Sequence, residues 1–138
     1  MSDAPLVTVV ERDEVAVMFR SAADEQEAIT RAWNDLEAAV GSLHGRRFFG
    51  VFDEVRHEYR ACVELRAGDD PDALGLETGS LAGGRYARRR LRGEPPAVYA
   101  QIAPAFEQLA RRPDRDDTRL GIEHYRSRDV IDLLLPVT

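Results

Sequence analysis

The clearest hydrophobic pattern in the sequence is a helical stripe in the first half. Its apolar positions recur at spacings of four, three and four residues, and they are Ile29, Trp33, Leu36 and Val40. Asp24 and Glu27 have the spacing of a capping box, which marks a helix start, and Gly41 is a common stop signal. The pattern therefore predicts one amphipathic helix between Asp24 and Gly41.

Short apolar and β-branched runs predict strands around this helix. In the first half they are 6–10, 15–19, 47–53 and 59–65, the last two forming a hairpin. Residues 67–84 are polar and rich in glycine, so they are predicted to form a long connecting loop, either a functional lid or a flexible linker.

The second half repeats this order of elements. A strand is predicted over 85–91, and a final hairpin over 121–125 and 130–136. Between them lies a second helical stripe, made of Val98, Ile102, Phe106 and Leu109. Pro104 falls inside this stripe and is expected to kink the helix or to delay its start.

The two halves therefore resemble each other, because residues 48–65 map onto 120–137 at a constant offset. We expect two strand–helix–strand–strand repeats, over 6–66 and 85–138, joined by the loop 67–84. Neither repeat alone buries its apolar faces well, so both are expected to join in one antiparallel sheet with two helices. The fold class is α+β, in a single domain over 1–138.

Composition narrows the classes of function. The chain has 138 residues, with 19 basic and 25 acidic side chains and a net charge of −6, which argues against a nucleic-acid or anionic-membrane binder. Every basic residue is arginine, so lysine-dependent cofactors and a Walker A phosphate loop are excluded. Cys62 is the only cysteine, and His44, His57 and His124 lack ligand spacing, so we expect no metal site.

Five arginines within 85–92 invite a nucleic-acid reading. In a strand, however, successive side chains point to opposite faces, and the acidic segment 114–117 is able to neutralise them. No nucleic-acid partner is therefore expected. Met1–Pro5 lacks the basic start of a signal peptide, and no apolar run is long enough to cross a membrane, so we expect a cytoplasmic protein without a membrane partner.

Three motifs carry a resemblance to a known family. They are Gly83-Gly-Arg-Tyr-Ala87, Arg119-Leu-Gly-Ile-Glu-His-Tyr125 and Ile131-Asp-Leu-Leu-Leu-Pro-Val137. In this order they resemble the GyrI-like small-molecule-binding domain, which includes effector-binding domains of bacterial multidrug-responsive transcription activators and stand-alone proteins. The resemblance spans residues 15–137. It implies two repeats in one antiparallel sheet, two helices and a central ligand groove.

The resemblance also implies a binding site. Glu123 matches a glutamate that commonly lies in the family's drug pocket, and Tyr125 follows on the same strand face. A carboxylate among aromatic rings loses hydration and favours a cation. The further candidates for lining the site are Tyr86, Tyr59, Trp33, Phe49 and Tyr99. Trp33 is also explained by core packing, and Glu123 by exposure or by an ion pair with Arg88 or Arg90.

Three functions remain open from the sequence. The first is non-catalytic binding or sequestration of flat, aromatic, cationic or amphipathic molecules without a cofactor, as in drug resistance. The second is hydrolysis of strained electrophilic natural products such as cyclopropane-bearing DNA alkylators, with Glu123 and Tyr125 as the catalytic residues. The third is inhibition of a protein target such as a topoisomerase. An exposed edge strand leaves both a monomer and a homodimer possible.

Overall fold

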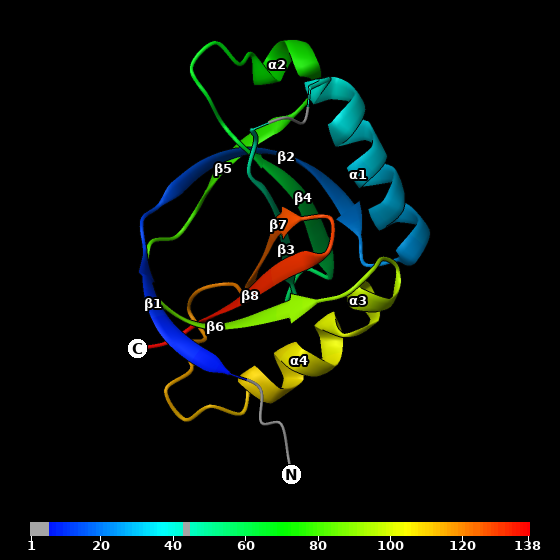
Figure 1. Ribbon diagram of the computed structural model, residues 1–138. Helices are drawn as coiled ribbons and strands as arrows, with labels where there is room; N and C mark the ends of the chain where they lie inside the picture. Colours follow the sequence, from blue (N-terminus) through cyan, green and yellow to red (C-terminus); the bar gives the residue numbers. More distant parts are fainter. Residues whose placement is uncertain (1–5, 43–44) are drawn as a thin grey trace. The chain divides into compact units, whose positions relative to one another are not determined.

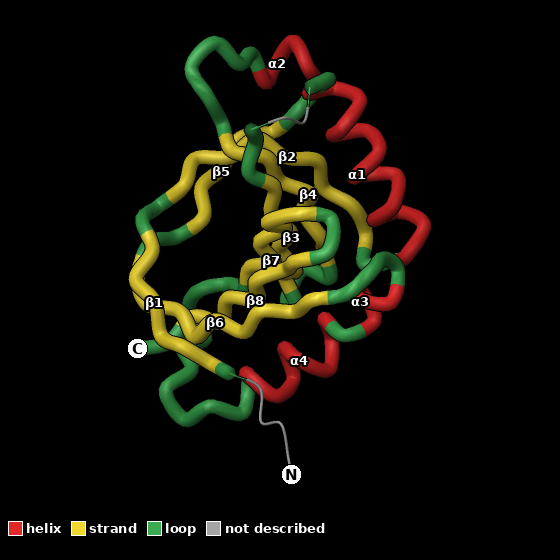
Figure 2. The backbone as a smooth tube through the Cα atoms, viewed as in Figure 1, coloured by secondary structure: helices red, strands yellow, loops and turns green. Residues whose placement is uncertain are grey.

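Eight strands and four helices make up the described part of the chain, residues 6–42 and 45–138 of a computed structural model (Figures 1 and 2). In sheet order the strands are β1 (Val7–Arg12), β6 (Gly84–Arg92), β8 (Val130–Pro136), β7 (Ile122–Ser127), β3 (Phe48–Asp53), β4 (Glu58–Glu64), β2 (Val15–Ala23) and β5 (Glu77–Leu81). The helices are α1 (Gln26–Val40), α2 (Pro71–Leu74), α3 (Ala97–Ala100) and α4 (Ile102–Leu109). The predicted α+β class with one antiparallel sheet is confirmed. Met1–Pro5 and His44 lie outside the described residues.

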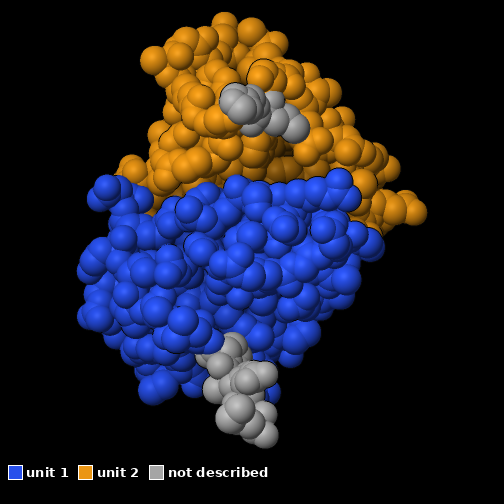
Figure 3. Space-filling model, in the orientation of Figure 1, with its two compact units in different colours: residues 1–13, 83–138 blue, residues 14–82 orange. Residues whose placement is uncertain are grey.

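The chain divides into two compact units, coloured in Figure 3. Unit 1 combines residues 1–13 with 83–138, and unit 2 is the continuous segment 14–82. The units thus differ from the predicted repeats 6–66 and 85–138, because the first strand of the chain belongs to unit 1.

Unit 2 is built around α1, which packs on β2 and β4. The apolar stripe predicted from the sequence faces the sheet, where Leu36 is fully buried. The start of the helix differs from the prediction. Glu25 occupies the N-cap without a side-chain hydrogen bond, and the backbone N–H of Asp24 donates to the carbonyl of His57 at 3.1 Å. The capping box is not formed because the helix begins at Gln26 with Glu25 at the N-cap, so Asp24 and Glu27 do not stand at the N-cap and N3 positions.

Unit 1 is built in the same way, with α4 packing on β6 and β8. Its core cluster includes Leu91, Leu109, Ile131 and Leu133. The second helical stripe is divided at Gln101 into α3 and α4, and Pro104 lies in the first turn of α4. The prediction that Pro104 delays the helix start is therefore confirmed. Proline has no backbone N–H, and the first turn of a helix does not need one.

Strands β1 and β5 each pair in the unit that consists mainly of the other half of the sequence. β1 belongs to unit 1, and β5, which directly precedes β6, belongs to unit 2. Only Asp13 and Glu14 separate β1 from β2, yet β1 pairs with β6 and β2 pairs with β5. The sequence predicted that residues 67–84 form a connecting loop. This prediction is wrong, because these residues contain α2 and β5. Four of the five residues of β5 are exposed, so this strand is held by its backbone pairing rather than by apolar burial.

Asp69 fixes the segment that leads into α2. Its carboxylate receives two hydrogen bonds from the guanidinium of Arg46, at 2.7 and 2.8 Å, and one from the backbone N–H of Arg66 at 2.7 Å. These hydrogen bonds, those from Arg46 foremost, lower the pKa of Asp69 to about 2. The carboxylate therefore stabilises the folded state in its ionised form.

We expect Asp69→Asn to lower the free energy of unfolding by about 1 kcal/mol at neutral pH. Because the pKa of Asp69 is about 2 when folded and 3.8 ordinarily, this difference should be full above pH 4 and vanish as the pH falls towards 2. Urea unfolding of both proteins across that range measures it. Asp35→Asn, at an exposed position, is the control, and a difference that persists at pH 2 would contradict the ion pair.

Candidate functional site

Glu123 and Tyr125 lie side by side on one face of β7. In the register with β8 they stand opposite Leu133 and Ile131, both fully buried in the core that α4 covers. Glu123 is only 8% exposed, and the hydroxyl of Tyr125 donates a hydrogen bond of 2.5 Å to its Oε1. The alternation predicted from the sequence therefore places a buried carboxylate on the helix side of unit 1.

Tyr99 extends this arrangement towards solvent. It belongs to α3, its ring meets the ring of Tyr125 edge-on at a centroid distance of 6.5 Å, and 48% of its surface is exposed. The two tyrosines therefore link the buried carboxylate of Glu123 to the surface. A carboxylate with little hydration beside aromatic rings favours a cation that also has apolar surface, because both the charge and the rings attract it.

Tyr86 lies on the opposite face of the same sheet. It stands opposite Pro136 in β8 and is 1% exposed, with the guanidinium of Arg119 centred 4.9 Å from its ring centroid. Burial raises the pKa of Tyr86, and the charge of Arg119 works in the other direction. The structure thus does not bring Tyr86 to Glu123.

Arg119 contacts the backbone and the tyrosine ring of the motif that contains Tyr86. Its guanidinium donates hydrogen bonds to the carbonyls of Gly83 at 3.3 Å, Arg85 at 3.0 Å and Val137 at 2.9 Å, and to Asp116 at 3.0 Å. We call this set of contacts the Arg119 latch. It joins the start of β6 to Val137, and Gly84, which has a positive φ, leaves the space that the guanidinium occupies.

The remaining three aromatic candidates lie in unit 2. The indole N–H of Trp33 donates to the hydroxyl of Tyr59 at 3.2 Å, and their rings meet edge-on at 6.4 Å. Tyr59 belongs to the core under α1 and Trp33 packs against that core. Phe49 stands opposite Cys62 and so occupies the other face, 1% exposed, with Arg47 at 5.8 Å from its ring centroid. The structure thus joins Trp33 to Tyr59 but not to Phe49.

Sequence reasoning missed a buried ion pair on β8. Asp132 is fully buried and receives hydrogen bonds of 2.7 and 3.0 Å from Arg90, with Arg126 at 3.6 Å. Burial opposes its ionisation, but the hydrogen bonds and charge of Arg90, with Arg126 and Arg88, outweigh burial and hold the pKa of Asp132 below its usual value. Arg90 therefore pairs with Asp132 on the face opposite Glu123. A single acid inside the apolar run 131–135 was the available signal.

A metal cluster and a membrane-spanning helix are both absent from the described ranges. Within residues 6–42 and 45–138, no three histidine, cysteine, aspartate or glutamate side chains gather closely enough to hold a metal ion. In the same residues no helix has both the length and the apolar character needed to cross a membrane.

Comparison with known proteins finds the same fold in several solved structures, although no family model and no curated protein matches the sequence. The Vibrio cholerae integron cassette protein VCH_CASS2 is 18% identical, with a TM-score of 0.76 over 96% of this chain and 95% of that one. SAV2435, solved bound to tetraphenylphosphonium, is 12% identical, with a TM-score of 0.69 over 96% and 94%. A Listeria innocua hydrolase encoded by lin2189 is 14% identical, with a TM-score of 0.59 over 99% and 94%. The fold implied by the sequence resemblance is confirmed.

Proposed function

We propose that this chain binds hydrophobic, aromatic cations without transforming them, and that Glu123, Tyr125 and Tyr99 form the binding site. The observation that carries the proposal is the carboxylate of Glu123, which is 8% exposed and held by the Tyr125 hydroxyl at 2.5 Å. The likeness of fold to SAV2435, which was solved with tetraphenylphosphonium, supports a ligand of this class.

Each of the three residues has a distinct part in this binding. Glu123 supplies the negative charge, whose attraction for a cation is strong where water is scarce. Tyr125 orients the carboxylate, and its ring packs on the apolar core. Tyr99, half exposed, offers a ring face at the surface to an arriving aromatic ligand. Recognition by shape and charge rather than by directed hydrogen bonds admits a broad range of ligands, as sequestration of cationic drugs requires.

Replacing Glu123 by glutamine tests the charge. We expect the affinity for tetraphenylphosphonium, measured by isothermal titration calorimetry, to fall about 30-fold, because the variant keeps the shape but removes the partner of the cation. The uncharged triphenylphosphine oxide should bind both proteins equally weakly.

Glu107→Gln provides the matched control, because Glu107 is an exposed acid on α4 and its replacement changes the net charge by the same amount. Unchanged affinity in Glu123→Gln, or an equal loss in Glu107→Gln, would show that the site lies elsewhere.

Hydrolysis is the second candidate, and one observation favours it. The hydrogen bond from the Tyr125 hydroxyl to the Glu123 carboxylate places a proton donor and an acceptor 2.5 Å apart, which suits general acid–base chemistry. Incubating strained electrophiles with catalytic amounts of protein and counting turnovers by mass spectrometry separates the two functions. Several turnovers that disappear in Tyr125→Phe support the hydrolase, whereas stoichiometric recovery of intact ligand excludes it.

A further inference from the structure

Asp132 is the only acid that the four strands of unit 1 place on the face opposite Glu123. It lies in β8, where it stands between Arg90 of β6 and His124 of β7, and it is fully buried. A buried carboxylate inside an apolar strand is costly unless cations surround it. The groups around Asp132 therefore decide whether it stays ionised.

Two arginines meet at one oxygen of this carboxylate. Arg90 donates two hydrogen bonds to Asp132, from Nε to Oδ1 at 2.7 Å and from Nη2 to Oδ2 at 3.0 Å. Nη1 of Arg126, near the end of β7, lies 3.6 Å from the same Oδ2, which is too far for a hydrogen bond. The two guanidinium groups therefore approach each other above β8, from the strands on either side of it.

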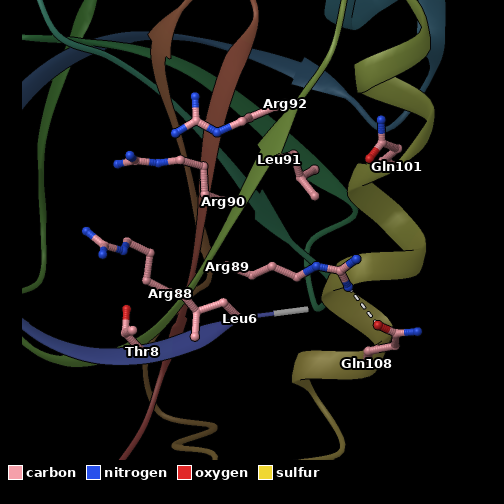
Figure 4. A pocket seen from close by; sticks show the side chains of 9 residues that line it. All are labelled: Leu6, Thr8, Arg88, Arg89, Arg90, Leu91, Arg92, Gln101 and Gln108. Atoms are coloured by element: carbon pink, nitrogen blue, oxygen red, sulfur yellow. Dashed lines mark hydrogen bonds between the residues drawn. The ribbon is translucent and has the colours of Figure 1, made fainter. Parts of the chain in front are cut away.

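Arg88 brings a third positive charge to this face. Figure 4 shows Arg88 and Arg90 extending to one side of β6, with Arg89 turned to the other. Alternate positions in a strand lie about 7 Å apart, so the long side chain of Arg88 reaches the surroundings of Arg90. Burial raises the pKa of Asp132, and the charge of Arg88 joins that of Arg90 in lowering it below its usual value.

The three arginines carry more positive charge than Asp132 neutralises. Three guanidinium charges against one carboxylate leave an excess of two. Arg88 has neither a hydrogen bond nor an ion pair with any described residue, and Arg126 has no hydrogen bond with them. The acids of the segment 114–117, which the sequence suggested as partners, pair instead with arginines close to them in the chain, which are Arg112, Arg115 and Arg119.

The converging guanidinium groups also reach solvent. The side chain of Arg126 is 45% exposed and that of Arg90 is 34% exposed. They meet above β8, which is separated by β6 from the edge strand β1, so they belong to the interior of the sheet face rather than to its edge. An anion in solution therefore has access to hydrogen-bond donors that come from two different strands.

We propose that Arg88, Arg90 and Arg126 bind the phosphate group of a phosphorylated small molecule. A phosphate monoester carries about two negative charges near neutral pH, which match the excess on this face. Its three terminal oxygens accept hydrogen bonds from guanidinium groups that arrive from different directions. Asp132 holds Arg90 through two hydrogen bonds, so this arginine is ordered before the ligand arrives.

A phosphate monoester fits these observations better than a carboxylate or a long polyanion. A carboxylate has one charge and two acceptor oxygens, so it would leave part of the excess charge uncompensated. The net charge of −6 repels a long polyanion, whereas a small dianion feels chiefly the arginines within a Debye length of about 8 Å.

Isothermal titration calorimetry of the full chain with phenyl phosphate and phenyl sulfate at pH 8 tests the charge of the ligand. The two probes share a ring and a tetrahedral group, but phenyl phosphate is a dianion at this pH and phenyl sulfate is a monoanion. We expect phenyl phosphate to bind at least several-fold more tightly. Equal affinity of the two probes, or no binding of phenyl phosphate at millimolar concentration, would overturn the proposal. Tighter binding of inorganic phosphate would assign the site to the free anion instead.

Replacing two of the arginines tests their part in binding. Arg88→Gln combined with Arg126→Gln should weaken the binding of phenyl phosphate about tenfold, because each exposed ion pair contributes a few-fold. The variant keeps the ion pair between Arg90 and Asp132, so it should retain the fold, which circular dichroism checks. Unchanged affinity in a folded variant would exclude these two arginines from the site.

Arg31→Gln combined with Arg111→Gln is the matched control. Both positions are exposed, and the two replacements remove the same charge from the chain. We expect the affinity for phenyl phosphate to stay unchanged in this variant. An equal loss in both pairs of replacements would reduce the effect to net charge and would contradict a site at Arg88 and Arg126.

Discussion

Replacing Leu133 by alanine should lower the free energy of unfolding by about 3 kcal/mol. Leu133 is fully buried in the core cluster of unit 1 and stands directly opposite Glu123. Removing three heavy atoms loses their burial and leaves a cavity that rigid neighbouring strands close only in part. Urea unfolding followed by circular dichroism measures the loss.

Leu134→Ala is the matched control for this prediction. Leu134 is equally buried but points to the other face of β8, opposite Ile122. We expect a similar loss of stability from both variants, with weaker tetraphenylphosphonium binding only in Leu133→Ala, where the support of Glu123 is removed. If both variants lose ligand affinity equally, loss of stability alone explains the change in binding.

Replacing Gly84 by valine should also cost about 3 kcal/mol of unfolding free energy. Gly84 has φ of 128°, a region that L side chains rarely adopt, and that strain alone costs roughly 1–3 kcal/mol. A Cβ at this position would lie 2.7 Å from Nη1 of Arg119. The side chain would therefore displace the guanidinium from the carbonyls that it joins in the Arg119 latch.

Two further variants separate these causes. Gly41→Val has a positive φ of 77° but no atom within 4 Å of the added Cβ, so it should show the backbone strain without the collision. Arg119→Ala combined with Gly84→Val should cost clearly less than the sum of the single variants, because each removes the same contacts. Strict additivity would mean that Gly84 does not act through Arg119.

The elements of both halves were predictable because their hydrophobic periods are strong. The stripe through Leu36 indicated α1, and the alternation in 59–65 placed Tyr59 and Ala61 on one face, as the structure confirms. The capping box at Asp24 was wrong because the helix starts at Gln26, with Glu25 rather than Asp24 at the N-cap. Local sequence shows which residues can cap a helix, but not at which of them the helix starts.

The exchange of β1 and β5 was not predictable from the sequence. Both β2 and β6 have an edge with which another strand can pair. The local sequence pattern does not determine which of these two edges β1 or β5 pairs with. β5 carries polar residues such as Glu77 and Thr78, so it has no hydrophobic period at all. A strand whose stability comes from backbone pairing leaves little signal in its side chains.

The candidate site was predictable in part. Alternation within one strand placed Glu123 and Tyr125 together, because that needs only the strand itself. The face of Tyr86 depends on the register of β6 with β8 and of β8 with β7, which one strand does not contain. Tyr99 meets Tyr125 from α3, a separate short helix that the stripe did not predict, so its position required the structure.

Because β1 belongs to unit 1, the two units also differ in how the gene encodes them, one as a continuous segment and the other as two segments. A single uninterrupted stretch of sequence, 14–82, supplies every strand of unit 2. Unit 1 is encoded in two pieces, and a truncated product that begins at residue 83 would leave β6 without β1. A circular permutant that links residue 138 to residue 6 and opens between Asp13 and Glu14 would reunite unit 1 in one continuous stretch.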